Sequence, residues 1–191
     1  MADPNRRDDG VEQANLAVVS DPFSSYTHAI YGMCCALSGR HAEGIQSSRR
    51  AVELDNESYL ARFILQFVLH VGGQFEECVA VGDAALAMSG RHSWSMATLA
   101  MALADLGKSE DADAVYAEMQ ARGRRQYVPP ALLALAASAA AREEEAVTHA
   151  REAYHIRDPH CEFFLSRHID FGRKLYAYSR FREIVAPFIN G

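Results

Sequence analysis

The sequence predicts an all-α protein built from repeated antiparallel helix pairs. Three observations support this fold class. Glycine-plus-polar pairs recur every 34 residues, at Gly39-Arg40, Gly73-Gln74 and Gly107-Lys108, and the same spacing next reaches Ala141-Arg142. Between these pairs, apolar residues recur at three- and four-residue steps, which is the period of an amphipathic helix. The chain is rich in alanine and has only six prolines among its 191 residues, so helix formation is favoured throughout.

Each 34-residue unit is expected to form a helix, a tight turn and a second helix. Glycine at the turn ends the first helix because it tolerates the left-handed backbone conformation. Small residues in the second helix let the two helices approach closely. Three sets of positions keep the phase: Gly44, Cys78, Ala112 and Ala146; then Ala51, Ala85, Met119 and Ala153; and, in the first helices, Tyr31, Leu65, Leu99 and Leu133. One such pair cannot bury both of its faces, so we expect consecutive pairs to stack on one another.

The elements follow in order along the chain. Residues 1–10 are polar and are predicted to be disordered, and Val11–Ser20 reads as the second helix of an incomplete half-repeat, 11–24. Four full repeats are expected at 25–58, 59–92, 93–126 and 127–160. A C-terminal cap, 161–191, would contain a short aromatic helix at Phe163–Ser166 and a final helix from Ser179 to Ile189, because the last repeat of a solenoid needs a covered outer face.

The period and these slots resemble the tetratricopeptide repeat (TPR) family, whose pattern is W-x2-L-G-x2-Y, A-x3-F, A and P. The chain departs from this pattern at the aromatic opening slot, which holds His28, Arg62, Met96 and Pro130. It also departs at Gln66, where Gly or Ala is usual, and at the closing proline slot, which holds Asn56 and Gly90. The resemblance covers about 130 residues and implies a right-handed superhelix. Residues 126–165 are similar to the last repeat of bacterial multidomain regulators, in which such repeats follow a cyclase, kinase or DNA-binding domain.

The resemblance also implies a protein-binding scaffold whose concave groove is lined by the first helix of each repeat. The expected groove residues with the most distinctive side chains are Tyr26, Met33, Phe63, Phe67, His70, Trp94, Met101 and Asp105. This face is apolar and aromatic, as interfaces often are. It lacks the Lys, Arg and Asn side chains that hold a peptide carboxylate in some family members. We therefore expect a protein or peptide partner, namely an amphipathic helix, in the groove. The same stripe also fits a core, if the superhelix or the C-terminal segment folds over it.

Two other roles are compatible with the sequence. The chain would be a homo-oligomerisation module if the half-repeat helix pairs between two copies through Val11, Leu16, Val18 and Val19. It would be a regulatory segment if it is part of a larger signalling or transcription protein, as the resemblance to multidomain regulators implies.

Composition and charge argue against several classes of partner. The formal net charge of −6 is unlike the basic surplus of a nucleic-acid-binding protein. No apolar run is long enough to span a membrane, and the N-terminus has no secretory signal, so a cytoplasmic location is expected. Cys34, Cys35, Cys78 and Cys161 form no CxxC pair and fit buried thiols better than disulfides.

No motif predicts an enzyme, a metal site or a cofactor. A nucleophile elbow, a phosphate-binding loop, HExxH and paired carboxylates in a defined context are all missing from the sequence. His155, His160, Cys161 and His168 are residue types that bind zinc, but their spacing fits none of the usual structural-zinc patterns. The sequence therefore predicts a protein that binds other proteins and catalyses no reaction.

Overall fold

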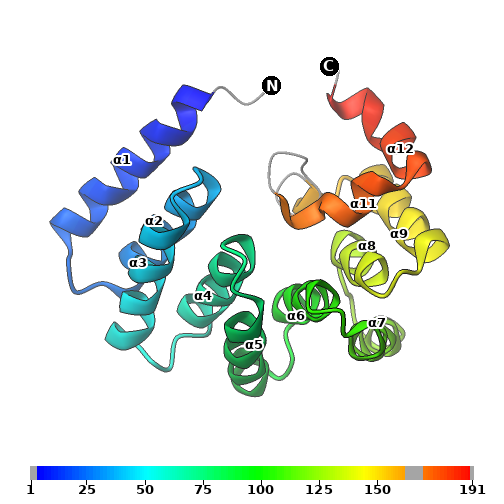
Figure 1. Cartoon of the computed structure of the whole chain (residues 1–191), viewed down its shortest axis with the longest axis horizontal. Helices are drawn as coiled ribbons and strands as arrows, with labels where there is room; N and C mark the ends of the chain where they lie inside the picture. The colour runs from blue at the N-terminus through cyan, green and yellow to red at the C-terminus, as the bar shows by residue number, and fades with distance from the viewer. Residues whose placement is uncertain (1–3, 162–169, 190–191) are drawn as a thin grey trace. The chain divides into compact units, whose positions relative to one another are not determined.

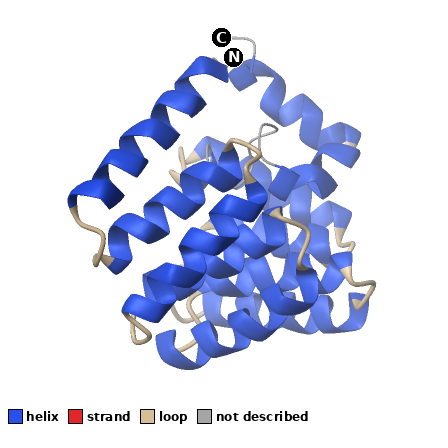
Figure 2. Ribbon diagram, turned by 60° about the vertical axis from the view of Figure 1, so that its left-hand side comes forward, coloured by secondary structure: helices blue, strands red, loops and turns tan. Residues whose placement is uncertain are grey.

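A computed structural model of the chain describes residues 4–161 and 170–189. All regular structure in these residues is helical and none is strand, so the predicted all-α fold class is confirmed (Figure 2). The chain divides into two compact units, Met1–Arg91 and His92–Gly191. None of the described helices is both long enough and apolar enough to cross a membrane.

The first unit contains one leading helix and two helix pairs (Figure 1). Its helices are α1 (Pro4–Ser20), α2 (Ser25–Leu37), α3 (His41–Leu54), α4 (Tyr59–Val71) and α5 (Phe75–Ser89). Helix α1 packs on α2, α2 packs on α3 and α4, and α4 packs on α5. The first unit is thus a two-layer stack in which each helix contacts its neighbours along the chain.

The second unit contains two further helix pairs and a C-terminal segment. Its elements are α6 (Ser93–Asp105), α7 (Ser109–Gly123), α8 (Pro130–Ala139), α9 (Glu143–His155), the 3-10 turn η1 (Asp170–Gly172), α11 (Arg173–Ala177) and α12 (Ser179–Ile189). Helix α6 packs on α7 and α8, and α8 packs on α9. The C-terminal segment returns to this stack, since α11 contacts α8 and α12 contacts α9.

The helix starts reproduce the 34-residue period. The second helices of the pairs begin at His41, Phe75, Ser109 and Glu143. The turn before each of these helices has one residue with positive φ, at Gly39, Gly73, Gly107 and Ala141. In each turn the next backbone N–H donates to a carbonyl in the last turn of the first helix, for example from Arg40 to Cys35 at 2.8 Å and from Arg142 to Ala137 at 2.8 Å. The turns therefore end the first helices as the Schellman motif does.

The first helices are capped in the same phase. The side chains of Ser24, Ser58 and His92 each accept a backbone N–H from the first turn of the helix that follows. The fourth first helix, α8, starts at Pro130 rather than near Tyr127. Pro129 and Pro130 explain this late start, because a residue before proline disfavours helical backbone while proline itself suits the first helical position.

Small residues set the distance within each pair. The phased positions Gly44, Cys78, Ala112 and Ala146 are all buried. In the first pair a Cβ on Gly44 would lie 2.7 Å from the carbonyl oxygen of Gly32, so these two backbones meet directly. The second helices carry a further buried row at Ala51, Ala85, Met119 and Ala153.

Both chain ends differ in part from the sequence expectation. Helix α1 begins at Pro4 and not at Val11, so residues 4–10, predicted to be disordered, are helical. Proline is compatible with the first turn of a helix, and Arg40 contacts Asp8 at 3.2 Å, which helps to tie this part of α1 to the stack. The expected final helix is present as α12. The expected aromatic helix at Phe163–Ser166 lies outside the described residues, and the short helix α11 was not predicted.

Candidate protein-binding surfaces

In the first unit, the residues predicted to line a groove lie on neighbouring helices. Tyr26 and Met33 are on α2, and Phe63, Phe67 and His70 are on α4, which packs against α2. Only Tyr26 is exposed, Met33 is half-buried, and the three α4 side chains are buried. The ring of Phe63 stacks on Tyr59 with centroids 6.2 Å apart, and His70 lies against Phe75 at 5.5 Å. The apolar stripe of α4 therefore works as packing, which is the alternative that the sequence left open.

In the second unit, the predicted groove residues are covered as well. Trp94 is half-buried, Met101 is buried, and the Asp105 side chain is only 3% exposed. All residues of α8 are buried. The segment that covers α8 includes α11, whose Leu175 is buried together with Phe171 of the preceding turn. The C-terminal segment thus packs on α8 and contacts one of the predicted groove residues, Asp105.

Asp105 is held by two basic side chains of this segment. Arg173 Nη2 lies 2.7 Å and Lys174 Nζ lies 3.1 Å from the same carboxylate oxygen, Oδ1 of Asp105. A carboxylate so far removed from water needs a charged partner to offset its lost hydration. Asp105, at the end of α6, therefore links the first helix of the third pair to α11.

A chain of hydrogen bonds joins the start of α6 to the end of the fourth pair. The Trp94 indole N–H donates to Nε2 of His160 at 2.9 Å, and His160 Nδ1 lies 2.6 Å from Oδ1 of Asp158. Since an indole nitrogen can only donate, Nε2 of His160 is the acceptor and its proton is on Nδ1. The second carboxylate oxygen of Asp158 accepts the N–H of Ala131 at 3.1 Å, in the first turn of α8. Because Nε2 is already engaged by Trp94, this histidine–aspartate pair has the geometry of a structural clamp and not of a general base.

The other residues singled out for chemistry do not form a reactive group. Cys35, Cys78 and Cys161 are buried and Cys34 is half-buried. Burial raises the pKa of the Cys34 and Cys35 thiols, which disfavours the reactive thiolate. Across residues 4–161 and 170–189, no three His, Cys, Asp or Glu side chains are grouped so that they would hold a metal ion. His168, one of the four zinc-type residues named above, lies outside these ranges.

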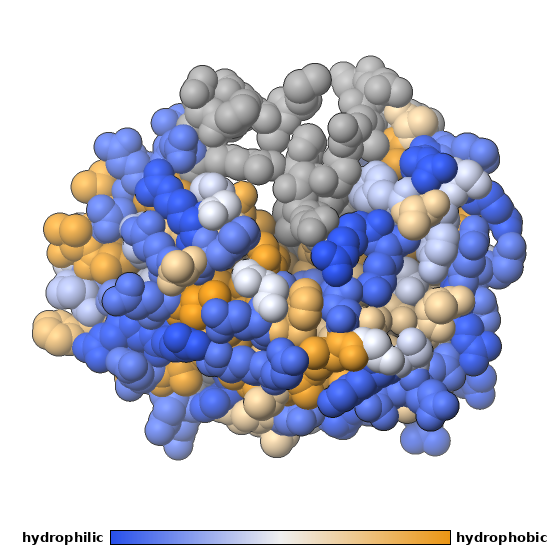
Figure 3. Space-filling model, viewed as in Figure 1, coloured by the Kyte–Doolittle hydropathy of each residue, from blue (hydrophilic) through white to orange (hydrophobic). Residues whose placement is uncertain are grey.

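Four exposed apolar side chains lie close together in sequence at the start of the first unit. Leu16 is 51%, Val19 70%, Phe23 78% and Tyr26 62% exposed, and we call these four residues the N-terminal apolar patch. They span the C-terminal half of α1, the α1–α2 connection and the first turn of α2. Figure 3 shows apolar side chains at the left-hand edge of the visible face, where Figure 1 places this part of the chain. Exposed apolar side chains gathered in this way are typical of protein interaction sites.

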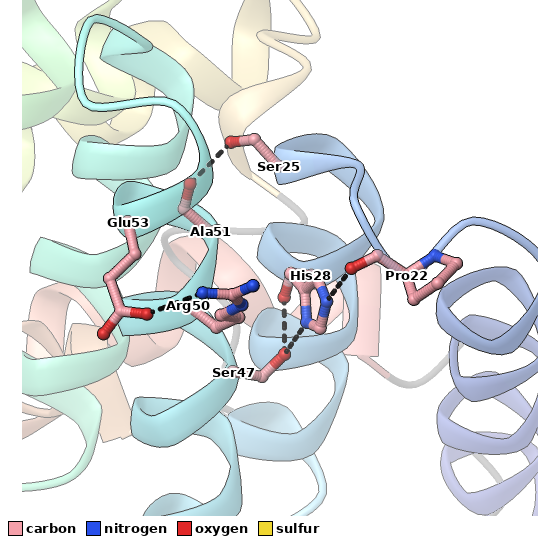
Figure 4. Close-up of polar contacts among 7 residues, drawn as sticks. All are labelled: Pro22, Ser25, His28, Ser47, Arg50, Ala51 and Glu53. Carbon is pink, nitrogen blue, oxygen red and sulfur yellow. Dashed lines mark hydrogen bonds and ion pairs between the residues drawn. The ribbon is translucent and has the colours of Figure 1, made fainter.

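The connection that carries Phe23 is held by hydrogen bonds (Figure 4). His28 Nε2 lies 3.0 Å from the Pro22 carbonyl oxygen, and the Ser47 hydroxyl donates to the His28 carbonyl at 2.9 Å. The Ser25 hydroxyl donates to the Ala51 carbonyl at 2.8 Å, which ties the start of α2 to α3. His28 fills the slot where the TPR pattern has an aromatic residue, and here it fixes the turn instead. The patch is therefore presented on a restrained backbone, which lowers the entropy lost when a partner binds.

Sequence reasoning identified this patch only in part. Leu16 and Val19 belong to the face considered for self-association and are exposed, whereas Val11 of the same set is buried and Val18 is half-buried. Tyr26 was assigned to the groove. Phe23 was missed, although a phenylalanine directly after Asp21-Pro22, in a turn, is a signal that could have been used. Comparison with the known protein families and with curated proteins finds no match.

Proposed function

We propose that this chain is a non-catalytic interaction module of the TPR type, which binds an apolar segment of another protein through the N-terminal apolar patch. The observation that carries the proposal is the exposure of Leu16, Val19, Phe23 and Tyr26 within eleven residues of one another, on a backbone fixed by His28 and Ser47. The TPR assignment is supported by the 34-residue phase of the helix starts, the left-handed turns and the buried small residues.

The residues of the patch and its surroundings favour a particular kind of partner. Aromatic side chains such as Phe23 and Tyr26 supply most of the binding energy in many interfaces, since they bury a large area for the loss of few rotatable bonds. Acidic residues lie close to the patch in sequence, since Glu12 and Asp21 are exposed on α1 and its connection. We therefore expect a helix with an apolar face and a basic rim, as charge complementarity at the rim favours correct encounter.

The proposal is tested by placing a photoreactive phenylalanine analogue at position 23. Irradiation in the native cell extract should give a discrete crosslinked protein, and Val19→Asp in the same chain should abolish the crosslink without reducing helix content. The matched control carries the analogue at Tyr127, which is 69% exposed and belongs to the other unit. Crosslinks of equal yield at both positions, or none from position 23, would contradict the proposal.

Self-association through the same face is the second candidate. It is favoured by the exposure of Leu16 and Val19 three residues apart on one face of α1. Light scattering over a dilution series decides between the two. A dimer that becomes a monomer on Leu16→Asp substitution would support self-association, and a monomer at micromolar concentration would exclude it.

A further inference from the structure

The face of the second unit formed by α6 and α8 has the chemistry of a binding site for a short helix. All residues of α8 are buried, and the Asp105 carboxylate lies at the end of α6 with its side chain only 3% exposed. The occupant of this face is a segment of the same chain, Asp170–Ala177, which forms η1 and α11.

The covering segment contributes two apolar anchors and two cations. Phe171 and Leu175 are four residues apart and fully buried. Between them, Arg173 and Lys174 both reach Oδ1 of Asp105. The order apolar-Gly-Arg-Lys-apolar therefore matches an apolar strip that ends in one buried negative charge.

The covering segment depends on tertiary contacts for its structure. Helix α11 has only five residues, too few to be stable as a helix without these tertiary contacts. Tyr178, between α11 and α12, has an extended backbone, and α12 is attached to α9 by packing and by an ion pair between Arg180 and Glu144. Helix α12 also holds the end of α11, because Arg182 donates to the Tyr176 and Ala177 carbonyls and the Tyr176 ring lies against Phe181. The ion pairs of Arg173 and Lys174 with Asp105 are thus separate from the contacts by which α12 holds Tyr176 and Ala177.

We propose that the α6–α8 face is a second protein-binding site, closed in cis by residues 170–177. Its partner presents a short helix that has two apolar residues four positions apart and two basic residues between them. Attachment gives the cis segment an effective concentration of about millimolar, so it outcompetes a free segment of equal intrinsic affinity. A partner must therefore bind this face more tightly than the cis segment does. This site is independent of the N-terminal apolar patch, so failure of the crosslinking experiment leaves it standing.

Charge reversal in the full-length chain tests the proposal. The probe is a fluorescein-labelled peptide with the sequence of residues 170–178, and its binding is followed by fluorescence anisotropy. Arg173→Glu with Lys174→Glu places two like charges against Asp105 and should release the cis segment. This variant should bind the probe at least about tenfold more tightly than the unchanged chain does, because the competing tether is removed. Arg151→Glu, at an exposed position of α9, is the control and should bind no better than the unchanged chain.

A charge swap separates a true site from a general loosening of the fold. Asp105→Lys should bind a probe with glutamate in place of both basic residues, and it should not bind the original probe. The chain with all three substitutions restores the cis ion pairs and should bind neither. The proposal is overturned if the released variant keeps its helix content and binds no more tightly than the unchanged chain. It is equally overturned if Asp105→Lys and the double variant both lose helix content, because residues 170–177 are then an obligatory part of the core.

Discussion

Ala141 takes the left-handed position of the fourth helix-pair turn, with φ of 55°, where the three other turns have Gly39, Gly73 and Gly107. A side chain in this conformation costs about 1–2 kcal/mol, while glycine loses somewhat more backbone entropy on folding. We predict that Ala141→Gly stabilises the protein by about 0.5–1 kcal/mol, measured by guanidinium unfolding. Gly73→Ala is the converse control and should destabilise by about 1 kcal/mol, because a Cβ there meets no other atom and the effect is purely conformational. Equal stability of all three chains would contradict this account.

His149 makes the stability of the second unit sensitive to pH. The Gln120 side chain donates to the Tyr116 hydroxyl at 2.7 Å, and that hydroxyl lies 3.1 Å from Nε2 of His149 and can donate to it. In the part of the chain that the structure describes, Nδ1 of His149 is buried without a hydrogen-bond partner. Burial lowers the pKa of His149 below its ordinary value of 6.5, although Glu152 and Glu145 act in the opposite direction.

The sign of the pH effect follows from this shift. Below pH 6.5 the unfolded chain binds a proton that the folded chain binds more weakly, so folding opposes protonation. The contribution of neutral His149 is therefore complete above pH 6.5 and is lost as the pH falls through the lower folded pKa. We predict that the free energy of unfolding decreases as the pH falls from about 8 to about 5.5. The substitution His149→Gln should make this decrease smaller. Part of the decrease should remain, because burial also lowers the pKa of His92. An identical profile for the unchanged chain and for His149→Gln would contradict this account.

At the scale of single elements, the close approach of α2 and α3 depends on having no side chain at Gly44. An added Cβ would lie 2.7 Å from a backbone carbonyl oxygen and 3.0 Å from the Ala36 backbone nitrogen, and neither atom can move without shifting α2. Helix propensity alone would favour alanine by about 1 kcal/mol. We predict instead that Gly44→Ala destabilises the protein by about 2–3 kcal/mol in chemical denaturation, because the steric clash of the added Cβ outweighs the higher helix propensity of alanine.

Gly82→Ala is the matched comparison in the second pair. There the closest atom to an added Cβ is the side-chain nitrogen of Gln66, at 2.4 Å, and this side chain can turn away more easily than backbone can. The loss of stability should be clearly smaller than for Gly44→Ala. The opposite order would show that the spacing of the first pair does not depend on direct backbone contact.

The helix pairs were predictable because their signals are local. Glycine at the turn, apolar spacing and small residues in the second helix all act within one 34-residue unit, and the structure has its helix starts in that phase. The two differences between the predicted and the observed helices have causes outside the 34-residue pattern. The late start of α8 depends on Pro129 and Pro130, and α11 is too short for periodicity to reveal.

At the scale of the whole molecule, the candidate binding surface was less predictable than the fold. The stripe of Phe63 and Phe67 has the same spacing whether it faces a ligand or packs in a core, so periodicity alone could not decide between them. What covers the face of α8 depends on contacts such as Asp105–Arg173, between residues 68 positions apart. Such pairs carry no local signal. The exposed patch was partly predictable, because Leu16 and Val19 lie three residues apart on one face of α1.

The stacked arrangement also predicts how damage spreads through the chain. Helix α2 packs on α1, α3 and α4, and corresponding contacts recur between neighbouring helices in the second unit. In such an array, stability is close to a sum of local terms and nearest-neighbour interfaces. We predict that Gly44→Ala raises amide hydrogen exchange most in α2 and α3 and less in α4 and α5. Exchange in α8 and α9 should be unchanged under native conditions, because local opening does not require global unfolding.

Hydrogen-exchange mass spectrometry of the unchanged chain and of Gly44→Ala measures this gradient. Ala141→Gly is the reciprocal variant and should slow exchange in α8 and α9 alone. An equal rise in all helices would mean that the chain unfolds as one cooperative body, and the additive description of the two units would then be wrong.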